Sequence, residues 1–106
     1  MDHTLSSHAA ALSALGHDAR LTIFRLLVRA GAPGLNVGDL CHETGLAAST
    51  LAHHLRTLVA AGLVLQERDG REVINTVDFD AVRRTLGFLT SECCTGVTLS
   101  VREDAA

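Results

Sequence analysis

Two adjacent cysteines, Cys93 and Cys94, are the residues of this sequence with the clearest capacity for chemistry. Two neighbouring thiols can hold one soft ion together, because thiolate sulfur is the ligand that such ions prefer. A third cysteine, Cys41, lies far upstream in the chain. An odd number of cysteines does not indicate a disulfide framework, so we expect free thiols and a cytoplasmic protein.

A second set of polar residues lies along residues 47–61, where the spacing of apolar residues predicts a helix. Leu51, Leu55, Leu58 and Val59 fall on one side, which is the expected core face. Hydroxyl, imidazole and guanidinium groups on the other side and flank suit the base edges and phosphates of a major groove. The predicted DNA-binding residues are Ser49, Thr50, His53, His54, Arg56 and Thr57, with Arg68 and Arg71 from the hairpin that follows.

Apolar spacing and helix breakers predict the elements that position these groups. Asn36 can cap a short helix over residues 37–44, and Gly45 supplies the turn before the longer helix. Asp69–Gly70 is a strong hairpin signal inside residues 63–77. Further helices are expected over residues 5–15, from Asp18 to Gly31, and over about 79–94, with a frayed tail at 98–106.

This order of elements indicates one winged helix-turn-helix domain, mainly α with a small β-hairpin wing and five helices. The helix-turn-helix occupies about residues 37–61 and the wing about 63–77. Three Phe and no Trp or Tyr in 106 residues suggest that a second copy completes the apolar surface. No segment has the length of a membrane span, which is about 18 apolar residues. The net charge of −3 requires any DNA affinity to come from a local basic patch.

Simpler structural roles are open for each of these groups. The polar side of residues 47–61 could be an ordinary solvated surface. Cys93 continues the apolar spacing of Leu86 and Leu89 and could act as a small buried hydrophobe, and Cys41 could pack in the core. An enzyme is not expected, because the sequence lacks a Gly-rich phosphate loop or a nucleophile elbow.

Several segments resemble the ArsR/SmtB family of metal-responsive bacterial repressors. ALSALGHDARLTIFRLL resembles the second-helix signature of that family, NVGDLCHETGLAASTLAHHLRTLVAAGLV its helix-turn-helix, and QERDGREVINTV its wing. The resemblance covers about residues 5–94. It implies a homodimer, built through the first and last helices, that blocks transcription at an operator until an inducer lowers its DNA affinity.

Members of the family have their metal-binding residues at different positions, and this chain lacks such a residue at most of these positions. Asn36 and Gly38 stand where some metalloid sensors have cysteines. Residues 80–96 lack the histidines of transition-metal sensors, and residues 21–27 lack the second-helix cysteine of persulfide sensors. FLTSECCTG resembles arsenic sensors with a tandem Cys-Cys after the last helix. The resemblance therefore implies As(III), methylarsenite or Sb(III) as inducer and no permanent cofactor.

The sequence does not identify a third ligand for an ion bound by Cys93 and Cys94. Cys41 could join Cys93 and Cys94, within one chain or across the dimer. Alternatively, a small cellular thiol could complete the shell, or a monosubstituted arsenical could need only two thiolates. The alternative functions are a repressor that responds to oxidants or reactive sulfur and one that responds to Zn or Cd. A helix C-terminus and the adjacent Glu92 disfavour a reactive thiolate, which weakens the redox alternative.

Overall fold

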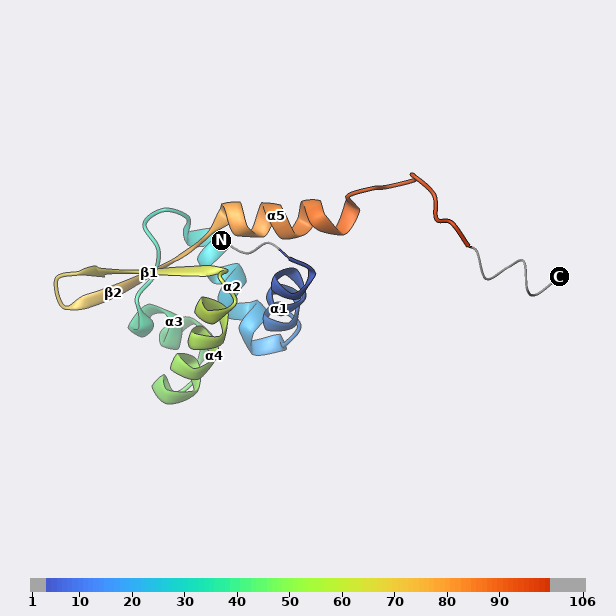
Figure 1. Ribbon diagram of the computed structural model, residues 1–106. Helices are drawn as coiled ribbons and strands as arrows, with labels where there is room; N and C mark the ends of the chain where they lie inside the picture. Colours follow the sequence, from blue (N-terminus) through green and yellow to red (C-terminus); the bar gives the residue numbers. More distant parts are fainter. Residues whose placement is uncertain (1–3, 100–106) are drawn as a thin grey trace.

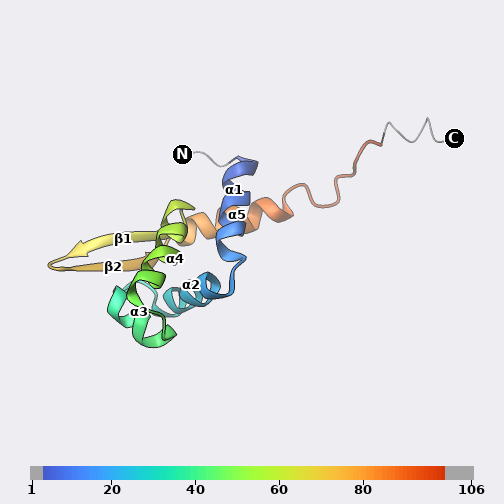
Figure 2. The ribbon, with the colours of Figure 1, turned by 90° about the horizontal axis from the view of Figure 1, so that it is seen from below.

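A computed structural model describes residues 4–99 and shows five helices and a two-stranded hairpin in that range (Figures 1 and 2). The predicted mainly α fold with a hairpin wing is confirmed. No helix in the described range is long and apolar enough to cross a membrane. The elements are α1 (Leu5–Leu15), α2 (Asp18–Ala30), α3 (Val37–Thr44), α4 (Ala48–Ala60), β1 (Val64–Asp69), β2 (Glu72–Val77) and α5 (Phe79–Thr90).

Leucine and isoleucine side chains from α2, α3 and α4 form the centre of the core. Leu51, Leu55 and Leu58 of α4 are at most 2% exposed, as their spacing predicts. Leu40 of α3 is fully buried, and Cys41 packs against the same cluster. The packing role considered for Cys41 is therefore the one that the structure shows.

In the first two helices, several large apolar residues lie outside the core. In α1 the buried residues are His8, Ala11 and Ala14, whereas Leu5 is 71% exposed and Leu12 is 39% exposed. The small alanines allow α1 to lie close to α2 and α4, and the leucines are left outside. In α2 the large residues divide between the two sides: Ile23, Phe24 and Leu27 are buried, whereas Leu21 and Val28 are exposed.

The two strands pair in an antiparallel register that runs from Val64 opposite Val77 to Asp69 opposite Glu72. The two-residue loop is therefore Gly70–Arg71, one position later than the predicted Asp69–Gly70. Gly70 has a φ of 64°, and a glycine at the first loop position with positive φ is typical of a type II′ turn.

A short bridge ties the wing to the loop between α2 and α3. Leu35 and Asn75 exchange both backbone hydrogen bonds, at 3.0 and 2.9 Å. The Asn75 side chain is fully buried: its Nδ2 donates to Leu35 O at 3.0 Å and its Oδ1 accepts from Gln66 Nε2 at 2.9 Å. Buried amides are stable only with such partners, so Asn75 fixes the base of the wing.

The last helix is shorter than predicted. Asp78 caps its start by accepting from Ala81 N at 3.1 Å, but it ends at Thr90 rather than near residue 94. Ser91 takes an extended conformation, and its hydroxyl donates to Phe88 O at 2.8 Å. Serine hydroxyls compete in this way with the helical hydrogen-bond ladder, which explains the early end. Residues 91–99 lead away from the body of the molecule (Figures 1 and 2).

Candidate DNA interface and thiol site

The turn between α3 and α4 has the geometry of a helix-turn-helix. Asn36 forms a capping box with Asp39, accepting from Asp39 N at 2.7 Å while Asp39 Oδ2 accepts from Asn36 N at 3.1 Å. Gly45 then takes the left-handed conformation that ends α3, with a φ of 74°. Ala47, the N-cap of α4, has no side chain that could bond the first N–H groups of the helix. Unbonded N–H groups at a helix start are suited to a phosphate.

The structure places most of the predicted DNA-binding residues on accessible surface. Ser49, Thr50, His53 and Arg56 of α4 are exposed. Thr57 is half-buried, and its hydroxyl donates to His53 O at 3.3 Å, so it is less available to a base. The exposed side of α4 thus carries hydroxyl groups near its start and one arginine at its middle.

His54 departs from the expected arrangement. It is half-buried, and its ring lies 4.8 Å from that of His17 and 5.7 Å from that of His53. Burial lowers the pKa of His54 from its usual value, and the nearby His17, Arg20 and His53 lower it further. A charge on His54 at mildly acidic pH is therefore disfavoured.

The wing carries Arg68 on β1 and Arg71 in the loop at its tip, and both are exposed. Glu67, Asp69 and Glu72 surround them along the hairpin. The wing therefore offers two arginines for a DNA backbone, within a local charge that is not strongly basic.

Substitution of Arg56 by alanine is expected to weaken operator binding by about 1–3 kcal/mol, because an arginine in the major groove binds guanine edges with two hydrogen bonds. Fluorescence anisotropy of a labelled operator gives the affinity, and sedimentation gives the dimer content. Arg25→Ala is a matched control, since Arg25 is an exposed arginine on α2, outside α4 and the wing. Equal affinities for Arg56→Ala and Arg25→Ala would show that α4 does not contact the bases of the groove.

Cys93 and Cys94 lie in the turn that follows α5, not on the helix. Both are exposed, and their Sγ atoms are 2.9 Å apart. Left-handed backbone at Glu92 (φ 62°) and at Cys94 (φ 65°) brings the two neighbouring side chains to the same side. Cys93 therefore does not continue the apolar stripe of Leu86 and Leu89, as its spacing suggested. The hydrogen bond with Cys94 raises the pKa of the Cys93 thiol, and partial desolvation raises it further.

Cys41 lies on α3, on the opposite side of the molecule from the segment after α5 (Figures 1 and 2). A third ligand from Cys41 of the same chain does not fit this arrangement. Within residues 4–99, no three His, Cys, Asp or Glu side chains come together as a group that could hold a metal ion. Among the described residues of one chain, the candidate thiol site thus consists of Cys93 and Cys94.

One histidine that the sequence left unassigned has a defined position. His8 is buried on α1, where it contacts Thr85 and Phe88 of α5 in the same chain. Its burial depends on contacts 77 residues away, so local spacing gave no signal for it. His3, the other histidine near the N-terminus, lies outside the described residues.

Comparison with known proteins identifies the family. The family model of a helix-turn-helix domain matches residues 15–67. The HTH-type transcriptional regulator YgaV of Escherichia coli (strain K12) is 34% identical over 86 residues, which cover 81% of this chain and 85% of YgaV. An ArsR-like transcriptional regulator from Rhodococcus sp. RHA1 is 25% identical, with a TM-score of 0.71 over 79% of this chain and 76% of its own.

A further solved structure has the same fold at lower identity. It is the homodimeric winged helix-turn-helix DNA-binding domain of Mb0332 from Mycobacterium bovis, a possible ArsR-family regulator. It is 24% identical, with a TM-score of 0.66 over 83% of this chain and 81% of its own. These relatives are regulators, in agreement with the expectation that the chain is not an enzyme. The chain belongs to the helix-turn-helix transcriptional regulators of the ArsR type.

Proposed function

We propose that this regulator is a homodimeric repressor that leaves its operator when a trivalent arsenical or antimonite binds Cys93 and Cys94. The observation that carries the proposal is the pair of exposed thiols with Sγ atoms 2.9 Å apart, at the end of α5. Two sulfur atoms at this separation can bind one soft ion together. The DNA contacts would come from the exposed residues of α4 and from Arg68 and Arg71 of the wing.

Exposed apolar residues on α1 and α5 support the dimer. Large apolar side chains that remain in contact with water on a small domain mark an interaction surface. The homodimeric domain from Mycobacterium bovis shows that this fold can form such an assembly. The proposed interface residues are Leu5 and Leu12 of α1 with Phe79, Leu86, Phe88 and Leu89 of α5.

The two-thiol geometry favours a ligand that needs only two sulfur atoms. Trivalent arsenic with three exchangeable positions takes three thiolates, whereas a methylated arsenical has two positions left for the protein. Because the described residues bring no third ligand to the pair, methylarsenite is the proposed best inducer. Arsenite and Sb(III) would bind with a small cellular thiol as the third ligand.

The electrostatics of the pair favour ion capture over oxidation. A peroxide sensor needs a thiolate at neutral pH, but the hydrogen bond between Cys93 and Cys94 raises the pKa of the Cys93 thiol. Methylarsenite condenses with the two thiols: two As–S bonds replace two As–OH bonds, and each hydroxide leaves as water with one thiol proton. Capture therefore needs no preformed thiolate. Zn and Cd are less favoured because they take more ligands than two thiolates, and no three His, Cys, Asp or Glu side chains group together within residues 4–99.

Titration of an operator-bound dimer tests the inducer. Labelled operator is followed by fluorescence anisotropy while methylarsenite, arsenite, Sb(III), Zn(II) or peroxide is added in separate experiments. We expect release at the lowest concentration for methylarsenite, at higher concentrations for arsenite and Sb(III), and none for Zn(II) or peroxide. The release corresponds to a coupling of about 1–3 kcal/mol between the two sites. Release by Zn(II) or peroxide with no effect of any arsenical would contradict the proposal.

A further inference from the structure

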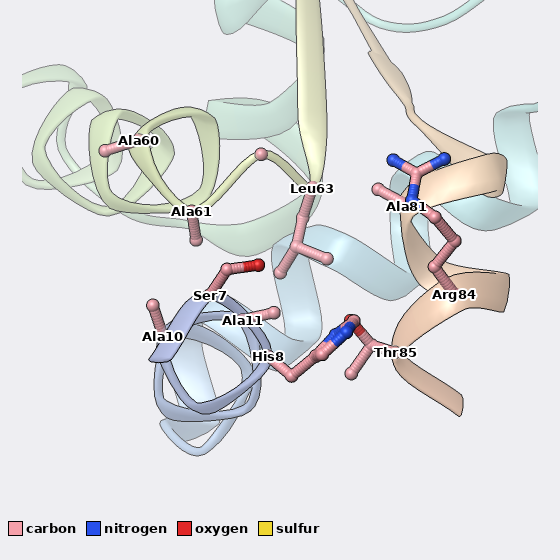
Figure 3. A pocket seen from close by; sticks show the side chains of 11 residues that line it. Ser7, His8, Ala10, Ala11, Ala60, Ala61, Leu63, Ala81, Arg84 and Thr85 are labelled. Carbon is pink, nitrogen blue, oxygen red and sulfur yellow. The ribbon is translucent and has the colours of Figure 1, made fainter. Parts of the chain in front are cut away.

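The thiol pair follows α5, and α5 packs chiefly on α1. The contact centres on His8, which is 5% exposed. Its Nδ1 lies 2.9 Å from Thr85 Oγ1 in a buried hydrogen bond, and its ring stacks on Phe88 with centroids 4.3 Å apart and planes at 18°. Figure 3 shows His8 of α1 and Thr85 of α5 directed toward one another. One side chain of α1 thus holds two successive turns of α5.

Phe88 also anchors the turn that carries the thiols. Ser91 donates to Phe88 O twice, from its N–H at 3.2 Å and from its hydroxyl at 2.8 Å. Cys93 N donates to Thr90 O at 3.2 Å. A ligand that reshapes this turn must therefore act on the last turn of α5, where His8 stacks.

On its other side, α1 is attached to the helices of the DNA-reading half. Ala11 and Ala14 are each 3% exposed, within the contact of α1 with α2 and α4. Arg20 Nε donates to Ala14 O at 2.7 Å. Because these contacts are tightly packed, a change at His8 is passed to α4 through a rigid helix.

A cavity of about 220 Å³ lies beside the His8–Thr85 contact (Figure 3). Small residues form much of its wall: Ala10 on α1, Ala60 and Ala61 at the end of α4, and Ala81 on α5. A packed interface cannot slide, but a space of this size between α1, α4 and α5 allows a second position of α5.

We propose that His8 is the positioning residue that couples the thiol pair to the recognition helix α4. With free thiols, the hydrogen bond to Thr85 and the stack on Phe88 hold α5 against α1. A ligand bound by Cys93 and Cys94 draws Phe88, in the last turn of α5, out of its stack on His8, and the cavity beside Thr85 leaves room for α5 to take a second position. This inference rests on the function proposed above and assigns its pathway.

The test compares the operator Kd with and without saturating methylarsenite in the full-length dimer. The wild-type ratio is expected to be about tenfold or more. Thr85→Val, which keeps the side-chain shape and removes the hydrogen bond, and His8→Asn, which removes the stacked ring, should each lower the ratio below about threefold. Equilibrium dialysis should show unchanged methylarsenite binding to the DNA-free variants. A purely structural role would weaken operator binding equally in both states and leave the ratio unchanged.

Ser13→Ala is the matched control, because Ser13 is an exposed residue of α1, and it should keep the wild-type ratio. Circular dichroism confirms that each variant is folded, and a reduced ratio in either variant supports the coupling. A full ratio in both Thr85→Val and His8→Asn overturns it while the proposed function stands. A wild-type ratio of one overturns the proposed function and the coupling together.

Discussion

Replacement of Gly34 by alanine is expected to lower the free energy of unfolding by about 2–5 kcal/mol, since it adds left-handed backbone strain to overpacking. Gly34 has a φ of 66°, which alanine rarely adopts. A Cβ at this position would lie 2.4 Å from Asn75 O, 2.7 Å from Ile74 Cγ2 and 2.8 Å from Thr76 Cγ2. The nearest atom is backbone of β2, held by its bridge to Leu35, so it cannot move aside alone.

Urea denaturation followed by circular dichroism measures this loss. Gly45→Ala is the matched control, because Gly45 has a φ of 74° and nothing within 4 Å of an added Cβ. Gly45→Ala should lower the free energy of unfolding only through left-handed backbone strain, by about 1–2 kcal/mol. The difference between the two variants isolates the contact with β2. Equal losses would show that the loop before α3 does not press against the wing.

Replacement of Cys93 and Cys94 by serine is expected to weaken the response to methylarsenite by about 10²–10⁴-fold, which is the gain that two linked binding groups give over one. The hydroxyl of serine keeps the size of the side chain but is a poor ligand for a soft ion. Each single variant should lose nearly as much of the response to methylarsenite as the double variant, because a lone thiol forms only one bond to the arsenic atom. Operator affinity without inducer should stay unchanged, since the pair is remote from α4.

The measurement is the concentration of methylarsenite that releases half of a labelled operator. Cys41→Ala is the control, because Cys41 packs against the core cluster and lies on the opposite side of the molecule. It should respond as the wild type does, apart from a small loss of stability. A normal response of the Cys93/Cys94 double variant would remove the thiol pair from the mechanism. A lost response of Cys41→Ala, with the fold intact, would indicate a ligand shared between protomers.

The parts of the fold that depend on local sequence were predictable. The cap at Asn36, the left-handed turn at Gly45 and the apolar spacing of α4 are set within a few residues, and the structure confirms each of them. The wing was also predictable, because its strands alternate around a turn. Its loop falls one residue later, since the pairing of Asp69 with Glu72 decides the register.

The features that depend on distant contacts were not predictable in the same way. The buried face of α1 follows from how closely its alanines let α2 and α4 approach, and helical spacing alone does not reveal this. His8 is buried by residues of α5, at the other end of the sequence. A signal was present for Asn75, which stands between Val73 and Val77 on the inward face of β2. A polar residue at such a position needs a specific partner.

The thiol site was predictable in composition but not in geometry. The adjacency of Cys93 and Cys94 is visible in the sequence, and a helical setting would separate their side chains by about 100°. The actual turn arises because Ser91 leaves the helix and Glu92 and Cys94 adopt positive φ. Thr90 and Ser91, two hydroxyl residues in succession, were the available signal for the early end of α5.

The bridge between Leu35 and Asn75 joins the loop before α3 to the wing. The helix-turn-helix and the wing of each protomer therefore form one rigid unit. In the proposed dimer, an inducer would therefore change the distance between the two units and not the shape of either one. Release from DNA would then depend on the spacing of the two half-sites, while the bases recognised within each half-site would stay the same.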